Sequence, residues 1–177
     1  MDVHLGPFRR RRYRRRQGAR RAARVPGETA QDAMMSVRPL AAADREAWLP
    51  LWAGYLAFYE ATVSDDVTET TFARLTGNDP KMFALAAERN GRVIGIAQCV
   101  VHDSTWSQAP YVYLSDLFVA PEARGSGAGC ALIEAVYDRA DRMGAARVYW
   151  LTHHTNATAR KLYDAVATND GFIEYRR

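Results

Sequence analysis

The chain has 177 residues, of which 48% are hydrophobic and 25% are charged, as expected for about one globular domain. It contains no apolar run of about 18 residues, so no transmembrane helix and no membrane partner are expected. Cys99 and Cys130 lie in separate apolar segments, and two cysteines are too few for a disulfide framework or a cysteine zinc site. A reducing compartment, and hence a cytoplasmic location, is the expectation.

The formal charge of +4 is unevenly distributed along the chain. Residues 1–33 hold ten arginines and three acidic residues, a charge of +7, which leaves −3 for residues 34–177. The arginine-rich segment lacks apolar periodicity and is expected to be a disordered N-terminal extension. Two interpretations stay open. It is an arm that binds nucleic acid or another anionic surface through residues 9–24, or it lies upstream of a start at Met34 or Met35.

From residue 36 onward, strand patterns and helix patterns alternate. Ser36–Leu40 is predicted to be a short strand, and Asp44 is predicted to cap the helix that follows. That helix carries aromatic and apolar residues at three- and four-residue steps: Trp48, Leu51, Trp52, Tyr55 and Tyr59. Thr68–Leu75 is predicted to be a second, shorter helix.

The rest of the chain predicts a hairpin first and then a strand–helix–strand unit. The pair Asn90-Gly91 is a strong signal for a two-residue hairpin turn. In chain order, the expected elements are strands Met82–Glu88, Arg92–Val101 and Tyr111–Val119, helix Gly127–Met143, strand Arg147–Leu151, a helix capped by Asn156, and strand Phe172–Tyr175. This order predicts an α/β (α+β mixed) fold, with a central mixed, mostly antiparallel sheet flanked by helices on both faces.

The sharpest local motif is the loop Arg124-Gly125-Ser126-Gly127-Ala128-Gly129, between a predicted strand and a predicted helix. Three glycines let the backbone turn tightly, and the helix start adds unpaired N–H groups that suit a pyrophosphate. A Walker loop would need Gly-Lys-Ser/Thr, and a dinucleotide fingerprint would open the fold with Gly-x-Gly-x-x-Gly spacing, so neither fits. A glycine turn without a ligand is the plain alternative.

Residues 113–129, YLSDLFVAPEARGSGAG, resemble the acetyl-CoA-binding segment of the GNAT N-acetyltransferases. The loop pattern of that family, Gln/Arg-x-x-Gly-x-Gly/Ala, is matched by Arg124, Gly127 and Gly129. The resemblance implies that acetyl-CoA is the cosubstrate and that no metal is needed. It further implies that backbone groups of Leu117, Phe118 and Val119 hold the pantetheine arm, and that Arg124, Gly125, Ser126, Gly127, Ala128 and Gly129 bind the pyrophosphate.

A second stretch, residues 150–163, resembles the segment in which these enzymes place an Asn on a strand–helix loop and a Tyr on the helix. The resemblance extends over roughly residues 36–177. It implies that Asn156 contacts the cofactor and that Tyr163 protonates the leaving thiolate. From its position on the apolar face of its helix alone, Tyr163 would be interpreted as a core residue.

Direct acetyl transfer needs a neutral amine, and a free alkyl amine has a pKa of about 10.4. Asp116 is the candidate base, because a carboxylate on a mostly apolar strand is desolvated and its pKa rises. Polyamine- and histone-type members of the family often carry an acidic residue where this chain has Ser115. Glu60, Asp65 and His102 are the alternative bases.

Acidic and aromatic residues cluster on and after the end of the first helix, where the resemblance implies the acceptor wall, and such a wall would suit a cationic amine. The expected wall consists of Tyr55, Tyr59 and Glu60, with Asp65 and Asp66 beside them. The segment His102–Trp106 joins two predicted strands and is expected to close the other side, with Trp106 as a lid residue or a dimer contact. The pair His153-His154 lacks a third metal ligand, and neighbours on a strand point in opposite directions.

The sequence therefore predicts an N-acetyltransferase that moves an acetyl group from acetyl-CoA to a primary amine by direct attack in a ternary complex. The acceptor is a small molecule, such as a polyamine, or a peptide amine of a protein lysine or N-terminus. A rival of another class is a non-catalytic module that binds acyl-CoA, or nucleic acid through its arginine-rich arm. A homodimer is expected, because the family commonly pairs and strand Phe172–Tyr175 would leave an open sheet edge.

Overall fold

A computed structural model describes residues 35–177, so the arginine-rich extension and Met34 lie outside the described residues. One five-stranded sheet has the order β1-β2-β3-β4-β5. The strands are β1 (Ser36–Pro39), β2 (Met82–Arg89), β3 (Arg92–Ser104), β4 (Ser107–Val119) and β5 (Arg147–Tyr149). Neighbouring strands pair antiparallel except β4 and β5, which are parallel. The expected mixed, mostly antiparallel sheet is confirmed.

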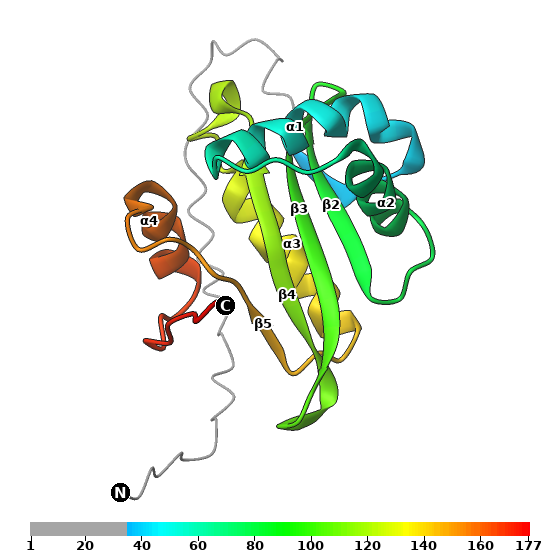
Figure 1. The fold of residues 1–177 in the computed structure, drawn as a ribbon. Helices are drawn as coiled ribbons and strands as arrows, with labels where there is room; N and C mark the ends of the chain where they lie inside the picture. The colour runs from blue at the N-terminus through cyan, green and yellow to red at the C-terminus, as the bar shows by residue number, and fades with distance from the viewer. Residues whose placement is uncertain (1–34) are drawn as a thin grey trace, which may run out of the picture. The chain divides into compact units, whose positions relative to one another are not determined.

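Helices cover both faces of this sheet, as expected (Figure 1). Helices α1 (Arg45–Phe58) and α2 (Asp65–Thr76) pack on one face, and α3 (Ala128–Arg142) packs on the other. Helix α4 (Ala157–Val166) lies beyond β5 and contacts α3. Short 3-10 turns at Ala42–Asp44 and Pro121–Ala123 precede α1 and the glycine loop. No helix within residues 35–177 has the length and apolar character needed to cross a bilayer.

The two faces of the sheet carry separate hydrophobic cores, because side chains alternate along each strand. On the α3 face, the buried residues include Leu85, Ala97, Cys99, Val112, Leu132 and Val136. On the α1 face, they include Trp48, Trp52, Phe72, Ala86, Ile96 and Phe118. The middle of β3 is therefore buried on both faces, and β4 contributes Leu114 to one core and Phe118 to the other.

A glycine brings α1 unusually close to β4. A Cβ atom on Gly54 would lie 2.7 Å from Cζ of Phe118, closer than carbon atoms approach. Only glycine allows this contact without displacing the Phe118 ring. The next residue, Tyr55, is thereby held against the backbone of β4 at Ser115.

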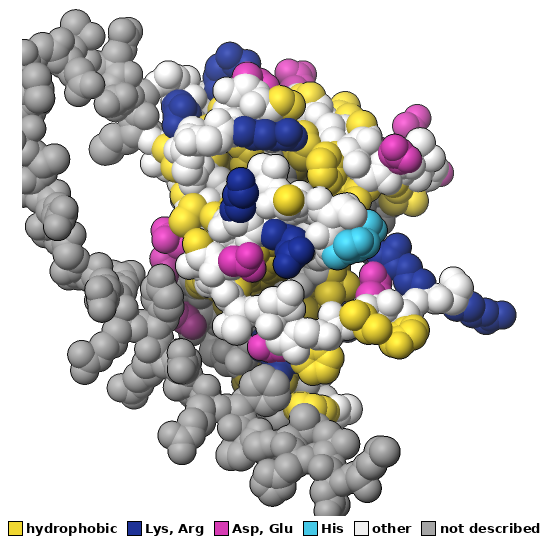
Figure 2. Space-filling model, turned by 90° about the vertical axis from the view of Figure 1, so that its left-hand side faces the viewer, with side chains coloured by type: hydrophobic (Ala, Val, Ile, Leu, Met, Phe, Trp, Pro, Cys, Tyr) yellow, Lys and Arg dark blue, Asp and Glu magenta, His cyan; other side chains and the backbone are white. Residues whose placement is uncertain are grey.

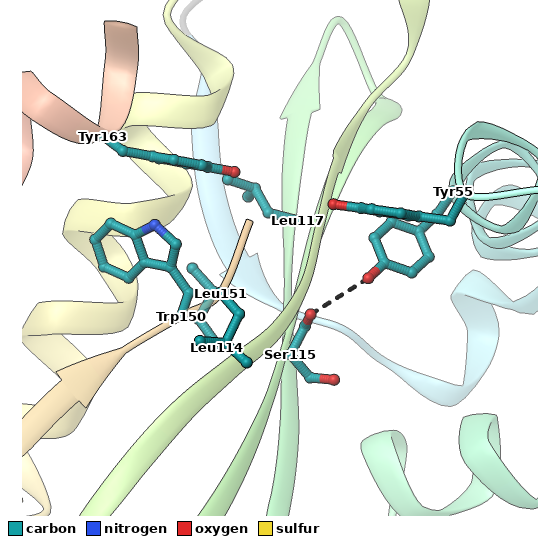
Figure 3. Close-up of a pocket in the computed structure, with 8 residues that line it drawn as sticks. Tyr55, Leu114, Ser115, Leu117, Trp150, Leu151 and Tyr163 are labelled. Carbon is teal, nitrogen blue, oxygen red and sulfur yellow. Dashed lines mark hydrogen bonds between the residues drawn. The ribbon is translucent and has the colours of Figure 1, made fainter. Parts of the chain in front are cut away.

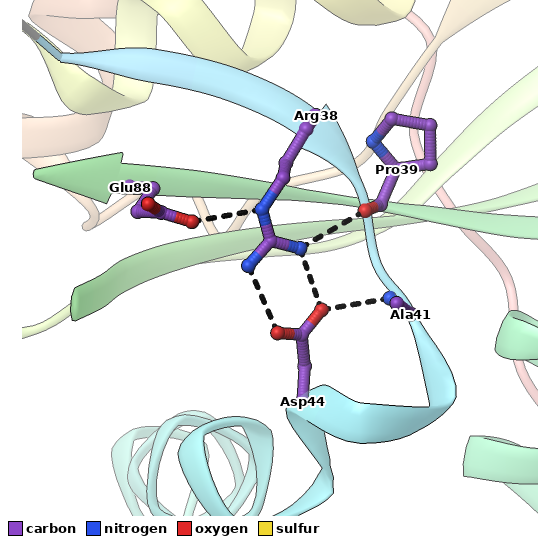
Figure 4. A network of polar contacts seen from close by, with 5 residues as sticks. All are labelled: Arg38, Pro39, Ala41, Asp44 and Glu88. Atoms are coloured by element: carbon purple, nitrogen blue, oxygen red, sulfur yellow. Dashed lines mark hydrogen bonds and ion pairs between the residues drawn. The ribbon is translucent and has the colours of Figure 1, made fainter. Parts of the chain in front are cut away.

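Asp44 does not cap α1 with its side chain, contrary to the sequence prediction. Its carboxylate instead accepts two hydrogen bonds from Arg38, at 2.6 and 2.9 Å, and one from the backbone N–H of Ala41 at 2.7 Å. Arg38 also donates from Nε to Glu88 at 2.8 Å (Figure 4). The guanidinium group holds the pKa of Asp44 below its usual range. The network ties β1, the 3-10 turn and β2 together.

The segment His102–Trp106 is not the loop that its polar residues predicted. Strand β3 continues to Ser104, which pairs with Ser107, and Trp106 lies in the turn between β3 and β4. Polar residues fit a strand here because this end of the hairpin is only half-buried or exposed. Trp106 is nine residues from Ser115 along β4, or about 30 Å of strand, which excludes it as a lid over the pocket described below.

The strand expected at Phe172–Tyr175 is absent from the structure. Residues 167–177 form no strand, and the side chains of Phe172, Ile173 and Tyr175 are 74–87% exposed. A β-favouring sequence pattern forms a strand only where a partner edge lies within reach, and β5 ends at Tyr149 instead of the predicted Leu151. The expected homodimer thus loses the open strand edge that motivated it.

Candidate active site

The site begins where β4 and β5 separate. The two strands pair at three positions, from Tyr111–Arg147 to Tyr113–Tyr149, and then diverge (Figure 1). Beyond Tyr113, β4 continues to Val119 while pairing with β3 alone. Backbone N–H and C=O groups on its other edge are therefore open to an extended ligand, since such groups need hydrogen-bond partners.

A β-bulge at Ser115 redirects the side chains of β4 at this point. Leu114 pairs with Cys99, and Asp116 pairs with Gln98, so Ser115 is an extra residue on β4. An extra residue reverses the alternation that follows it. Leu114 consequently faces the α3 core, whereas Asp116 faces α1 together with Gln98.

A small pocket lies in the gap between the diverging strands (Figure 3). Its free volume is about 20 Å³, room for about one water molecule, so a substrate enters only if side chains move aside. Tyr163 enters it from α4 and Tyr55 from α1, on opposite sides (Figure 3). The lining residues are Tyr55, Tyr59, Leu114, Ser115, Leu117, Trp150, Leu151 and Tyr163.

Tyr163 sits at the pocket with its ring half-buried. It packs edge-on against Trp150, with ring centroids 5.3 Å apart. Burial, with a smaller contribution from Tyr59, raises the pKa of Tyr163 to about 12. The hydroxyl therefore keeps its proton at neutral pH and can donate it to a developing anion in the pocket.

Asp116 lies behind Ser115, on the α1 side of β4. Burial raises the pKa of its carboxyl group, and a hydrogen bond from Gln98 Nε2, 2.9 Å long, partly opposes that rise. The hydroxyl of Tyr55 donates to the carbonyl of Ser115 at 3.3 Å (Figure 3). The negative charge of Asp116 adds to burial in raising the pKa values of Tyr55 and Tyr59. A carboxylate with a raised pKa is suited to accept a proton near neutral pH.

The glycine loop lies at the start of α3. Gly125 and Gly127 have φ angles of +76° and +86°, and Gly127 is the residue that precedes the helix. Ser126 Oγ is buried and has no hydrogen-bond partner among the described residues. An unsatisfied hydroxyl beside free helical N–H groups fits an anionic ligand such as a pyrophosphate.

Arg124 does not extend into the loop in this structure. Its Nε donates to the carbonyl of Val119 at 3.2 Å, and its guanidinium lies 5.6 Å from the centre of the Phe118 ring. On the side of the molecule that carries α4, several lysine and arginine side chains lie among uncharged and acidic ones (Figure 2). Helix α4 itself contributes Arg160 and Lys161. Basic side chains on this side suit a negatively charged nucleotide.

Comparisons with known proteins decide the family. The model of the acetyltransferase (GNAT) family matches residues 47–167. The chain belongs to the GNAT family. It is 39% identical over 143 residues to the D-amino-acid N-acetyltransferase HPA3 of Saccharomyces cerevisiae, covering 80% of this chain and 89% of that protein. It is 34% identical to an uncharacterized N-acetyltransferase, YhfO, of Bacillus subtilis, covering 80% and 95%.

Solved structures show the same fold. An aminoglycoside acetyltransferase, AAC(6')-Iy, in complex with a bisubstrate analog of CoA and acetylneamine, has a TM-score of 0.73 at 21% identity, with 82% and 98% of the two chains covered. A ribosomal-protein-alanine N-acetyltransferase from Brucella melitensis has a TM-score of 0.70 at 20% identity, with 81% and 99% covered. The protein is therefore an acyltransferase enzyme of the GNAT family, with a fold shared by structures that hold CoA-related ligands.

In this acetyltransferase, Asn156 has a clear local role. Its side-chain oxygen accepts from the N–H of Ala159 at 3.4 Å, and its Nδ2 donates to Thr152 at 3.2 Å. Asn156 thus caps α4, as expected from the sequence, and fixes the helix that carries Tyr163. A contact of Asn156 with the cofactor stays a prediction.

Several expected site residues lie away from the pocket. Glu60 is exposed just beyond α1, with a φ angle of +52°, and does not line the pocket. Asp65 and Asp66 are exposed in the first turn of α2. His102 bonds through Nε2 to the hydroxyl of Tyr149 at 2.9 Å, and its Nδ1 lies 2.7 Å from the Asp103 carbonyl. The described residues include no cluster of three or more His, Cys, Asp or Glu that would suit a metal ion.

Sequence reasoning missed Gln98, Trp48 and Trp150. Within residues 35–177, Gln98 is the one polar side chain in the buried core, at 1% exposed. A single glutamine in the middle of the apolar run from Val93 to Val101 was a signal that could have identified it. Trp150 lines the pocket because β5 ends one residue before it.

Proposed function

We propose that the enzyme transfers the acetyl group of acetyl-CoA to a primary amine by direct attack in a ternary complex. The observation that carries this proposal is the pocket between β4 and β5, with Tyr163 on one side and Tyr55, backed by Asp116, on the other. An acid that lines the pocket, and a buried carboxylate behind the opposite wall, suit a reaction that protonates one atom and deprotonates another.

The glycine loop and the open edge of β4 are the proposed acetyl-CoA site. Leu117, Phe118 and Val119 would bind the pantetheine arm through their backbone, and residues 124–129 would bind the pyrophosphate. The buried, unpartnered hydroxyl of Ser126 supports this placement. Arg124 would reach the phosphates after leaving the Val119 carbonyl.

In the proposed reaction, the neutral amine nitrogen attacks the thioester carbonyl carbon, and the carbon–sulfur bond breaks. The amine proton goes to Asp116, and the departing sulfur takes the proton of Tyr163. Burial raises the pKa of both groups, which favours a carboxylate that accepts a proton and a tyrosine that holds one. After the products leave, Asp116 releases its proton to solvent and Tyr163 takes one up, so both groups return to their starting states.

The acceptor is proposed to be a cationic amine bound beside tyrosine rings. Tyr55 and Tyr59 line the pocket, no basic side chain does, and the Asp116 carboxylate lies behind it. An aromatic surface backed by a negative charge attracts an ammonium group. Because HPA3 is named a D-amino-acid N-acetyltransferase, free amino acids form a second acceptor class to test.

The test is free-thiol release from acetyl-CoA with a panel of amines. The panel contains polyamines, D- and L-amino acids, a lysine peptide and an aminoglycoside. We expect thiol release with at least one simple primary amine, and product mass should increase by one acetyl group. Binding of acetyl-CoA without turnover on any amine would instead favour the non-catalytic module.

We further propose that the enzyme is a homodimer. The exposed side chains of Phe172, Ile173 and Tyr175 are apolar surface that a second copy would cover. Light scattering at micromolar concentration should give twice the chain mass of 19.8 kDa. A mass equal to one chain would contradict the dimer.

A further inference from the structure

A buried chain of hydrogen bonds connects the core of α1 with Asp116. Trp48, which is fully buried, donates from its indole Nε1 to Gln98 Oε1 at 2.7 Å. Gln98 in turn donates from Nε2 to Asp116 Oδ2 at 2.9 Å. Three elements, α1, β3 and β4, thus contribute one residue each.

The chemistry of these groups fixes the direction of the chain. An indole N–H can only donate a hydrogen bond, so the amide oxygen of Gln98 must face Trp48. The NH₂ group of the same amide must then face Asp116. A reversed amide would place two donors against each other at Trp48, in a site that excludes water. Trp48 therefore locks the orientation of Gln98.

The orientation of the Gln98 amide affects the pKa of Asp116, the residue that accepts the amine proton in the proposed reaction. An N–H donor stabilises the carboxylate form of Asp116 and opposes the effect of burial. The bond engages Oδ2, and hydrogen bonds from the side chains of Tyr55 and Ser115 also favour the carboxylate form. A reversed amide would present an acceptor instead, which only the protonated carboxyl group can match.

We propose that Trp48 is a positioning residue for the general base Asp116 and acts through the locked amide of Gln98. This inference rests on the proposed function, in which Asp116 accepts the amine proton. Trp48 lies in the core and touches neither substrate nor the pocket, so its side chain would otherwise be assigned to packing alone.

The other titratable groups that face Asp116 do not supply this orientation. Tyr55 and Tyr59 approach it from α1, Tyr113 from its own strand, and Cys99 from β3. The charge of Asp116 raises the pKa of each of these groups, so all four stay neutral near pH 7. Arg139 acts on Cys99, on the opposite face of the sheet.

The test compares Trp48→Phe with Trp52→Phe. Trp52 lies one helical turn from Trp48, is stacked on it at 5.7 Å, and is also buried. Its indole nitrogen has no hydrogen-bond partner among the described residues, so Trp52→Phe removes a similar ring segment without breaking a bond. It is a matched control for lost packing.

The readout is the pH profile of kcat/KM with one amine. At low pH, protonation of the base lowers kcat/KM, and this part of the profile is the acidic limb. We expect Trp48→Phe to move the acidic limb to higher pH, so that kcat/KM at pH values below it falls about tenfold relative to wild type. Trp52→Phe should leave the limb in place. Equal limbs in wild type and Trp48→Phe, or equal shifts in both tryptophan variants, would overturn the proposal.

Gln98→Met provides a second variant, in case Trp48→Phe does not fold. It removes the donor at similar volume and should raise the limb as Trp48→Phe does; an unmoved limb would refute the proposal. In the double variant, Trp48→Phe should add no further shift, because its effect passes through Gln98. An additive shift would mean that Trp48 acts by another route.

A readout without turnover separates this proposal from the proposed function. The ¹³C carboxyl signal of Asp116 reports its protonation directly in each variant. A signal that titrates at higher pH in Trp48→Phe than in wild type supports the effect of Trp48 on Asp116. This result is independent of the pH profile of Asp116→Asn, which, if unchanged, would remove Asp116 as the base. An Asp116 signal that titrates at the same pH in wild type and Trp48→Phe overturns the positioning role alone.

Discussion

The two sides of β4 differ in how the chain builds them. On the proposed cofactor side, one continuous segment, residues 124–129, forms the glycine loop, whose backbone groups would bind the ligand. On the proposed acceptor side, Tyr55, Gln98 and Asp116 come from three elements up to 61 residues apart, and their side chains would form the site. A site built from one segment leaves a contiguous pattern in the sequence, whereas a site built by sheet register does not.

The two sides also differ in electrostatics. The cofactor side offers helical N–H groups and nearby basic side chains to an anion. The acceptor side holds a desolvated carboxylate ringed by tyrosines. Tyr163 lies between them, because α4 places it at the pocket beside the open edge of β4. Variants on each side should therefore fail in different ways.

The largest effect is expected where the two sides meet. Tyr163→Phe should lower kcat by about 10²–10⁴-fold, because it removes the hydroxyl that is proposed to protonate the thiolate. The affinity for acetyl-CoA should change little, which isothermal calorimetry can measure. Tyr137→Phe is the control: that half-buried tyrosine does not line the pocket and donates its hydroxyl to the Val166 carbonyl, and the variant keeps its ring against Trp150, so kcat should not change. Unchanged turnover in Tyr163→Phe would remove the acid from the mechanism.

Gly127→Glu should prevent acetyl-CoA binding and leave the proposed acceptor side unchanged. The new carboxylate would occupy the proposed pyrophosphate position. Acetyl-CoA at about 100 times its Kd should stabilise the wild type by about 2.7 kcal/mol, and this gain should vanish in the variant. Gly144→Glu imposes the same backbone strain, at φ +68°, at the other end of α3 and should keep the gain. Equal thermal shifts in Gly127→Glu and wild type would refute the loop assignment.

The sequence predicted the local structure of the proposed cofactor side more completely than that of the proposed acceptor side. Positive φ angles at Gly125 and Gly127, and the cap at Asn156, follow from residue types that favour these conformations locally. The mixed, mostly antiparallel sheet and the helices on both faces followed from the order of the predicted strands and helices; the order of the strands in the sheet was not predicted. Such features depend on neighbours within a few residues, so the sequence displays them.

The bulge at Ser115 could not be predicted, because it depends on how β3 and β4 align. A regular strand would have placed Asp116 on the α3 face with Leu114, away from Tyr55. The link from Trp48 to Gln98 spans 50 residues and is visible only in the fold. The prediction of a strand at Phe172–Tyr175 was wrong for a related reason. The local pattern of residues does not show whether a neighbouring strand edge is available for pairing.

The titration of Asp116 should also change the free energy of unfolding with pH. Because burial raises the pKa of Asp116 above its unfolded value of about 3.9, the folded protein holds a proton that the unfolded chain has lost. Wild-type stability should therefore fall as pH rises through this window. Asp116→Asn lacks the titration and can still accept from Gln98, so its stability relative to wild type should increase with pH. Urea unfolding from pH 4 to 8 measures the difference. The opposite slope would mean a lowered pKa.

The smallest effect is expected at Glu60, which tests whether the acceptor side ends at the pocket. Its exposed carboxylate can attract a cationic amine only through solvent, where salt at about 0.15 M screens charges beyond about 8 Å. Glu60→Gln keeps the shape and should raise KM less than about twofold at low salt, with kcat unchanged, and not at all at 0.15 M. Glu46→Gln removes the same charge at the other end of α1, about 21 Å away, and should leave KM unchanged. A large rise in KM for Glu60→Gln that persists in salt would instead mean that Glu60 moves into the pocket and contacts the amine, as the sequence suggested.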